Sequence, residues 1–276
     1  MRIMRNHGQI SLIIAGLLWL LAGAVDAASQ RLILTGSSTV APLVGEMARR
    51  FESQFPGVRI DVQTGGSSRG INDVRKGIAD IGMVSRQLKQ NENDLYAFTI
   101  ALDGISLIVH ADSPIVSLSK TQIADMFTGQ ITHWSVVGGT DARITVVNKA
   151  EGRSTLELLL DYLELKNSEI KPHIIIGDNA QGIKTVAGNR NAIGYLSIGA
   201  AEYEVKRGAP IRLLALDGVQ ASVKNIHNGS FPLSRPLNLV TASEPQGLIR
   251  QFIAFAQSSQ VHDLIKSQYF VPVDAD

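Results

Sequence analysis

Three loops rich in Gly, Ser and Thr are the parts of this sequence best suited to binding chemistry. Each follows a strand-like run and opens a helix-like run: LILTGSSTVAP (32–42), DVQTGGSSRGI (61–71) and ITVVNKAEGRSTL (144–156). Such a loop presents backbone N–H groups and hydroxyls at the positive end of a helix dipole, where an anion binds without a catalytic group. For one loop alone, helix capping is the commoner role of Ser and Thr. Three such loops together predict a site for a small oxyanion.

Other chemistry has weaker support. Gly66–Gly70 satisfies G-x-S-x-G between a strand and a helix, so a serine hydrolase with Ser68 as nucleophile is one alternative. However, the sequence has no HGGG-like oxyanion segment, and none of its histidines has a distinctive setting. It also contains no H-E-x-x-H motif, no histidines paired at metal spacing and no Walker-type loop, so neither a metal nor a nucleotide site is indicated.

The elements that must position the loops alternate between strand and helix, as in α/β units. Apolar periodicity and turn residues predict strands at 32–34, 58–62, 80–84, 105–109, 144–147, 173–176, 192–196, 211–215 and 237–240. They predict helices at 40–51, 71–78, 120–127, 156–163, 246–256 and 261–268. Because ligands collect at the carboxyl ends of strands in open α/β sheets, the loops can share one crevice.

The start of the chain indicates export. Arg2 and Arg5 precede an apolar run, Ile10–Val25, which ends in small residues near Ala27. This pattern predicts a signal peptide over residues 1–27. A membrane anchor is the alternative, although the run is short for a membrane span.

Composition narrows the class further. The sequence contains no cysteine, which excludes a disulfide framework and the lipid-bearing cysteine of a lipoprotein. Basic and acidic residues number 26 and 25, and loss of Arg2, Arg5 and Asp26 with the leader leaves 24 of each. Nucleic-acid binders usually carry a basic face, so none is indicated. We expect a periplasmic or secreted protein that is not a lipoprotein.

A series of short motifs resembles a known family. The motifs are Gly36–Pro42, Gly65–Ser68, Ala79–Arg86, Asp103–Ile105, Phe127–Trp134, Val137–Gly139 and Asn191–Tyr195. Singly they are weak, but in this order and spacing they resemble PstS-like phosphate-binding proteins of bacterial phosphate ABC transporters. The resemblance covers nearly the whole predicted mature chain. It implies a monomeric binding protein, not an enzyme, that needs no cofactor, captures inorganic phosphate and delivers it to an ABC permease.

The resemblance also implies a type II periplasmic binding protein fold. In this α/β fold each of two lobes is a mixed sheet flanked by helices, and the ligand lies in the cleft between the lobes. The first crossing between lobes is expected at Ile105–His110 and the return near Leu233–Val240. Lobe one then comprises 29–106 plus 238–276, and lobe two comprises 107–237.

By the same resemblance, the ligand-binding residues follow from the matching loops. We expect them to be Ser37, Ser38, Thr39, Ser67, Ser68, Ser85, Arg86, Asp103, Lys149, Gly152, Arg153, Ser154 and Thr155.

The departures from the family pattern concern the choice of anion. Lys149 stands at the position of a family arginine, and Arg153 is an additional cation in the loop. Arg86 replaces an aspartate that in some members accepts the proton of hydrogen phosphate. Sulfate, molybdate or tungstate is therefore an alternative ligand, unless a carboxylate such as Asp103 or Glu151 supplies the acceptor. A phosphate-sensing or adhesive extracellular protein without a permease is a further alternative.

Overall fold

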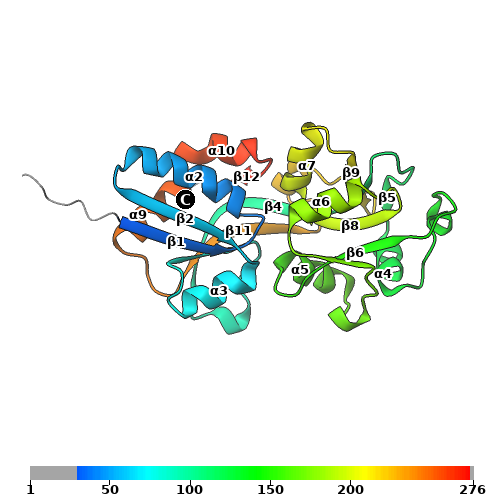
Figure 1. Ribbon diagram of the computed structural model, residues 1–276, viewed down its shortest axis with the longest axis horizontal. Coiled ribbons are helices and arrows are strands. Elements are labelled where there is room, and N and C mark those ends of the chain that lie inside the picture. Colours follow the sequence, from blue (N-terminus) through cyan, green and yellow to red (C-terminus); the bar gives the residue numbers. More distant parts are fainter. Residues whose placement is uncertain (1–29, 274–276) are drawn as a thin grey trace, which may run out of the picture.

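One strand of 15 residues, β4 (Tyr96–His110), runs from one half of the molecule into the other (Figure 1). Its first part pairs with β11 (Ser234–Thr241), and its second part pairs with β8 (Ala192–Ser197). A lobe of strands and helices lies on either side of this change of partner. The chain therefore has the two-lobed α/β fold that the sequence predicted.

The computed structural model describes residues 30–273. The predicted signal peptide, residues 1–27, lies outside the described residues. None of the helices in the described part of the chain combines the length and hydrophobicity needed to cross a membrane.

Lobe one is formed by both ends of the chain around the first part of β4. Besides β4 and β11 it contains β1 (Gln30–Gly36), α2 (Ala41–Gln54), β2 (Val58–Thr64), α3 (Ser67–Arg75), β3 (Ile81–Val84), η1 (Gln90–Glu92), α9 (Gly247–Ala256), η4 (Ser259–Val261), α10 (His262–Ser267) and β12 (Val271–Pro272). The strand order is β2-β1-β3-β11-β4. β2 and β3 are parallel to β1, whereas β11 is antiparallel to β3 and β4. The sheet is thus mixed, as predicted.

Lobe two is formed by the middle of the chain around the second part of β4. Besides β8 it contains β5 (Ser117–Leu118), α4 (Lys120–Thr128), η2 (Trp134–Val137), β6 (Thr145–Lys149), α5 (Ser154–Leu163), η3 (Asn167–Glu169), β7 (Ile174–Ile176), α6 (Asn179–Ala187), α7 (Ile198–Lys206), β9 (Ile211–Leu213), β10 (Ala215–Leu216) and α8 (Val223–His227). The strand order continues as β4-β8-β6-β7. β6 is parallel to β7 and β8, whereas β4 is antiparallel to β8.

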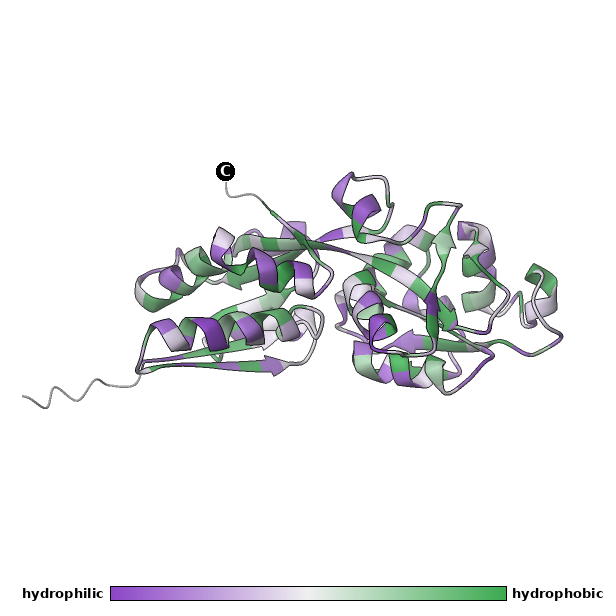
Figure 2. Ribbon diagram, turned by 90° about the horizontal axis from the view of Figure 1, so that it is seen from above, coloured by the Kyte–Doolittle hydropathy of each residue, from purple (hydrophilic) through white to green (hydrophobic). Residues whose placement is uncertain are grey.

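Each lobe has its own hydrophobic core between strands and helices, where hydrophobic residues are concentrated (Figure 2). In lobe one, Phe51 and Phe252 meet edge to face with their ring centres 5.4 Å apart. In lobe two, Phe127 and Tyr195 lie 5.7 Å apart in a similar arrangement. The apolar face predicted for the first helix is buried at every position: Val40, Leu43, Val44, Met47, Ala48 and Phe51. The two cores let each lobe act as a rigid support for the loops between them.

All the predicted strands and helices overlap observed elements. The largest differences are a strand at 96–104, which forms the first part of β4, and the helices α6 and α7, none of which the sequence analysis predicted. The predicted strand at 211–215 is divided into β9 and β10.

Candidate functional site

The first predicted loop is held in place by the contact between β1 and β3. Gly36 lies opposite Met83 with φ +134°, and a Cβ there would collide with the Met83 carbonyl oxygen, so only glycine fits. The Ser37 N–H donates to that carbonyl at 2.8 Å, and the Ser37 hydroxyl accepts from the Thr39 N–H at 3.1 Å. These bonds fix the loop that delivers Ser38 and Thr39 to the start of α2.

The second loop brings lobe one close to lobe two. Gly66 has φ +96°, and a Cβ there would lie 2.6 Å from the carbonyl oxygen of Gly152 in lobe two. Glycine therefore permits this approach of the two lobes. Ser67, the first residue of α3, accepts from the Ser85 N–H at 3.2 Å and donates to the Ser154 hydroxyl of lobe two at 3.1 Å.

The third loop supplies the lobe-two side of the site. Arg153 is the N-cap of α5, and Ser154 and Thr155 are its first residues. The Ser68 N–H donates to the Gly152 carbonyl at 3.3 Å, which ties this loop to the second one. The first N–H groups of a helix have no partner within the helix, and the helix dipole is positive there. The starts of α2, α3 and α5 thus provide positive potential around one point between the lobes.

At this point lies a small, hydroxyl-lined cavity of about 10 Å³. Its lining residues come from both lobes: Ser37, Ser38, Thr39, Gly66, Ser67, Ser85, Arg153, Ser154 and Thr155. The Ser85 and Ser154 hydroxyls lie 2.6 Å apart, and Ser37 donates to Ser85 at 2.9 Å. The hydroxyls therefore lie close enough to contact one small ligand together. The three predicted loops meet here, together with the residue that follows β3.

Eight of the predicted ligand-binding residues line this cavity: Ser37, Ser38, Thr39, Ser67, Ser85, Arg153, Ser154 and Thr155. The other five are not part of its lining: Ser68, Arg86, Asp103, Lys149 and Gly152. Ser68 donates to Glu157 at 3.3 Å, so its hydroxyl is engaged by a carboxylate of lobe two.

Arg235 at the start of β11 is a site residue that the sequence analysis did not predict. Its guanidinium is buried and donates to Thr155 Oγ1 at 3.0 Å and to Thr39 Oγ1 at 3.3 Å. Nε and Nη2 both donate to Asp103 Oδ2, at 3.1 and 2.9 Å. Asp103 therefore neutralises and orients the arginine, which contacts hydroxyls of both lobes. A basic residue in an apolar crossing strand, with Asp103 in the other crossing, was a signal for this pair.

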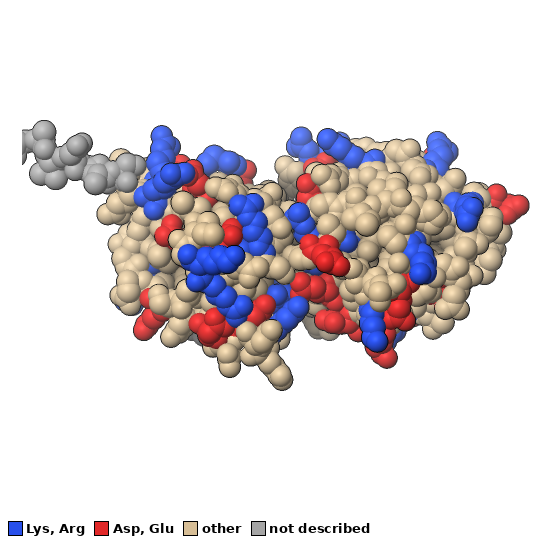
Figure 3. All heavy atoms as spheres, turned by 60° about the horizontal axis from the view of Figure 1, so that its bottom comes forward, with Lys and Arg blue, Asp and Glu red and all other residues tan. Residues whose placement is uncertain are grey.

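Arg86 is directed away from the cavity into an ion-pair cluster. It donates to the two carboxylate oxygens of Glu92 at 2.7 and 2.9 Å, and its Nε lies 2.9 Å from Glu157 of lobe two. Although burial acts to lower the pKa of Arg86, the hydrogen bonds that it donates to Glu92 and the charge of Glu157 raise that pKa above its usual value. Lys89 also meets Glu157 at 2.7 Å. Basic and acidic side chains adjoin at the junction of the lobes on this side of the molecule (Figure 3).

Lys149 is buried behind the cavity and bonds an amide. Its Nζ donates to Asn179 Oδ1 at 3.0 Å, and the Asn179 amide donates to Thr39 Oγ1 at 3.2 Å. Burial, with a smaller contribution from Arg235, lowers the pKa of Lys149 to about 7. Lys149 thus reaches the cavity through two intermediate side chains and not directly.

None of the residues that line the cavity is a carboxylate. Asp103 is bonded to Arg235, and Glu157 meets Arg86 and Lys89. Glu151 is exposed and accepts from Asn167 at 2.9 Å. The lining therefore consists of helix N–H groups, hydroxyls and one arginine, which together suit an anion.

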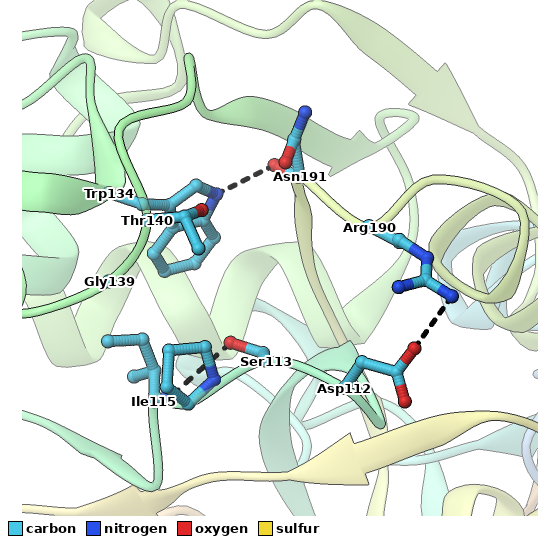
Figure 4. A pocket seen from close by; sticks show the side chains of 9 residues that line it. Asp112, Ser113, Ile115, Trp134, Gly139, Thr140, Arg190 and Asn191 are labelled. Carbon is cyan, nitrogen blue, oxygen red and sulfur yellow. Dashed lines mark hydrogen bonds and ion pairs between the residues drawn. The ribbon is translucent and has the colours of Figure 1, made fainter.

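A second cavity, of about 170 Å³, lies in lobe two away from the three loops (Figure 4). The Trp134 indole donates to the Asn191 carbonyl at 3.0 Å, and Arg190 pairs with Asp112 at 2.8 Å. Arg190, the basic residue that lines this second cavity, is exposed and already paired with Asp112. The second cavity therefore suits an anion less well than the cavity between the lobes. Within residues 30–273 no group of three or more His, Asp or Glu side chains is placed to hold a metal ion.

Comparisons with known proteins identify the family to which the chain belongs. Residues 22–260 match the model of the PBP superfamily domain. Phosphate-binding protein PstS of Bacillus subtilis is 28% identical over 253 residues, which cover 90% of this chain and 82% of that protein. PstS of Pseudomonas aeruginosa is 25% identical over 272 residues, which cover 90% of this chain and 84% of that protein.

Solved structures extend the comparison. The crystal structure of a protein from Clostridium perfringens, described as a phosphate ABC transporter substrate-binding protein with bound phosphate, is 32% identical with a TM-score of 0.83. The match covers 89% of this chain and 100% of that one. An ABC-type phosphate transport receptor from Vibrio cholerae is 28% identical with a TM-score of 0.72, covering 88% and 100%. The chain belongs to the PBP superfamily and, within it, to the PstS-like proteins.

Proposed function

We propose that this protein binds inorganic phosphate between its two lobes and delivers it to an ABC permease. The observation that carries the proposal is the cavity in which the starts of α2, α3 and α5, a set of hydroxyls and Arg153 converge, with Arg235 bonded to two of those hydroxyls from behind. The relatives support it, since those from Bacillus subtilis and Pseudomonas aeruginosa are named phosphate-binding proteins. Phosphate is also the ligand bound in the similar Clostridium perfringens structure.

Binding exchanges hydrogen bonds that now join the lobes. Ser67 and Ser85 of lobe one both bond the Ser154 hydroxyl of lobe two. A phosphate between them accepts the hydroxyl hydrogens in place of the neighbouring oxygens. The hydroxyls and the guanidinium then contact the anion from both sides, so that closure of the lobes and binding are coupled.

The hydroxyl lining also determines which protonation states of the anion the site can bind. A hydroxyl can accept as well as donate, so a serine can take the P–OH hydrogen of hydrogen phosphate that a carboxylate accepts in some relatives. A lining without carboxylate discriminates less against sulfate, because no buried negative charge repels a fully deprotonated anion. Sulfate is therefore the second candidate ligand, and molybdate and tungstate share its chemistry.

Isothermal titration tests these candidates directly. Purified protein is titrated with phosphate, sulfate and molybdate at one ionic strength. Saturable one-to-one binding of phosphate supports the proposal. If sulfate or molybdate binds and phosphate does not, that anion is the ligand and phosphate is not. If none of the three anions binds, the proposed function is wrong.

We further propose that the lobes hinge where β4 changes partner. The change falls between Gly104 and Ile105, and the return strand β11 begins at Ser234, next to the Leu233 carbonyl that accepts from Ile105 N–H at 3.0 Å. Two adjacent crossings of this kind suit a hinge. These crossings lie within a few residues of the predicted division into 29–106 plus 238–276 and 107–237.

The cellular setting completes the proposal. The predicted signal peptide at 1–27 is expected to direct export to the periplasm, and delivery requires a permease docked on the closed protein. The protein is proposed to act as a monomer. Cell fractionation with antibody detection tests the location, and size-exclusion chromatography with light scattering tests the oligomeric state.

The hydrolase alternative is not retained. The relatives are binding proteins of transporters, and the Ser68 hydroxyl contacts the Glu157 carboxylate. A nucleophilic serine is usually activated by an imidazole. The group that Ser68 meets here is a carboxylate that is already ion-paired with Arg86 and Lys89.

A further inference from the structure

A groove of about 610 Å³ lies beside the anion cavity and is also lined by both lobes. Ser38 and Thr39 line both the cavity and the groove. Asn179, the first residue of α6 in lobe two, lines the groove but not the cavity. Ser38 and Thr39 therefore lie between the cavity and the groove, and Asn179 lies on the groove side of Thr39, to which it is hydrogen-bonded.

The two side chains are joined across the lobes. The Asn179 amide donates to Thr39 Oγ1 at 3.2 Å. Lys149 Nζ, which is a donor, faces Asn179 Oδ1 at 3.0 Å, so the amide NH₂ must be the end that faces Thr39. Asn179 and Thr39 are both buried, which places this bond inside the closed molecule.

Thr39 is also held by a second donor. Its hydroxyl oxygen also accepts from Arg235 Nη2 at 3.3 Å. With two donors directed at its oxygen, the Thr39 hydroxyl has its own hydrogen left to donate. The bond from Asn179 thus holds the Thr39 side chain in place between the cavity and the groove. It also leaves the Thr39 hydroxyl hydrogen available for a ligand in the cavity.

We infer that Asn179 determines the ligand class by closing the anion cavity against the groove, so that inorganic oxyanions are accepted and phosphonates or phosphate monoesters are excluded. The inference rests on the proposed function. The organic group of such a ligand, bonded to phosphorus in a phosphonate and to an ester oxygen in a monoester, needs an exit from the cavity, and the groove is the adjoining space. Asn179 bonded to Thr39 occupies the passage between them.

The groove indicates which substituent an opened wall admits. Its lining combines apolar side chains such as Ile183 and Phe270 with three carboxylates and one cation, namely Glu46, Asp178, Glu204 and Arg49. Because Arg49 pairs with Glu46, the excess negative charge of the groove comes from Asp178 and Glu204. An amine at the end of a short alkyl chain suits such a lining. The appropriate probe is therefore 2-aminoethylphosphonate, with phosphate as the reference ligand.

The test compares both ligands on the wild type and on Asn179→Ala by isothermal titration. The wild type is expected to prefer phosphate by about 100-fold or more, and the variant to reduce this preference at least about tenfold. Phosphate itself should bind about fivefold more weakly to the variant, since one hydrogen bond that orients Thr39 is lost. Asn179→Ser, with its smaller side chain, should reduce the preference in the same direction.

Tyr203→Ala is the matched control, because Tyr203 lines the groove but not the cavity and is not one of the residues that hydrogen-bond the Thr39 hydroxyl. This variant should keep the wild-type preference. The inference is wrong if the Asn179 variants fold, by thermal unfolding, and keep the wild-type preference, or if Tyr203→Ala lowers it equally. A wild type that does not bind phosphate contradicts the proposed function and the inference together, whereas an unchanged preference contradicts the inference alone.

Discussion

At the scale of single residues, the site separates the groups that line the cavity from those that orient them. Hydroxyls and Arg153 line the cavity, whereas Asp103 and Lys149 act through Arg235 and Asn179. Positive charge near the ligand is therefore partly neutralised before the anion arrives. We expect the selectivity among anions to depend on which of these hydroxyls can direct their hydrogens into the cavity.

Arg153 is predicted to contribute directly to phosphate affinity. It lines the cavity and lies across Gly66, where a Cβ would be 2.9 Å from Arg153 Cδ. Arg153→Ala should weaken binding by about 1.5–3 kcal/mol, the worth of a hydrogen bond to a charged group, or roughly 10- to 150-fold in Kd. Titration calorimetry measures the change. Arg69→Ala, at an exposed arginine paired with Asp73 on α3, is the control and should leave affinity unchanged.

Asp103 is predicted to be required for stability more than for binding. Asp103→Asn leaves the Arg235 guanidinium buried without its countercharge, which should cost about 3–5 kcal/mol in the free energy of unfolding. Phosphate then supplies the missing negative charge, so saturating phosphate should raise the melting temperature more in the variant than in the wild type. A smaller rise in the variant would show that the anion does not interact with Arg235.

Lys149 is predicted to make stability depend on pH. Burial lowers its pKa from 10.5 to about 7, so between these values the unfolded chain binds the proton and the folded chain does not. Stability therefore rises with pH over this range. The charged and titratable groups placed around Lys149 are Arg235 on β11, Arg153 before α5, Asp178 before α6 and Tyr195 on β8.

The comparison is urea unfolding of the wild type and Lys149→Met at about pH 7 and about pH 9.5. The wild type should gain stability relative to the variant at the higher pH. A difference in stability that stays the same at both values would mean that Lys149 titrates near its ordinary pKa.

At the scale of elements, the sequence predicted those whose signal is local. α2 shows a buried apolar face at helical spacing, and β8 is a continuous apolar run bounded by a turn. α6 was missed because Gly182 and few apolar residues weaken its pattern; its start is set by Asp178, which accepts from Gln181 N–H at 2.8 Å. The strand at 96–104 was missed because it is partly exposed and is stabilised by pairing with β11, which is far away in the sequence.

The site was predicted to the extent that its loops are local motifs. Residues such as Ser37 and Ser154 were identified because each begins or precedes a helix. Arg235 was missed because its partners, Asp103 and Thr155, are far away in the sequence. Arg86 was expected to face the ligand, but Glu92 and Glu157, which no local pattern links to it, hold it elsewhere.

Helix α5 is predicted to hold the lobes together through Glu157. This carboxylate meets Arg86, Lys89 and Ser68 of lobe one, so it stabilises the closed arrangement. Glu157→Gln should speed phosphate dissociation about two- to tenfold with little change in association, as expected for partly exposed ion pairs. Stopped-flow fluorescence measures both rates. Glu164→Gln, which removes an exposed pair within lobe two, should change neither rate.

At the scale of the whole molecule, two lobes with separate cores meet at a surface made of hydroxyls, glycines and ion pairs. Gly66 allows the backbones to approach, and the crossings in β4 and β11 keep the lobes in register. Such a design binds by closing around a ligand that both lobes contact. The central claim is that phosphate occupies the cavity between the lobes.

A crystal structure of the protein grown with phosphate tests this claim most directly. The account predicts one phosphate between the lobes, within hydrogen-bond distance of the Ser85, Ser154 and Thr155 hydroxyls and of a nitrogen of Arg153. Phosphate found only elsewhere, for example in the lobe-two cavity beside Arg190 and Asp112, would contradict it.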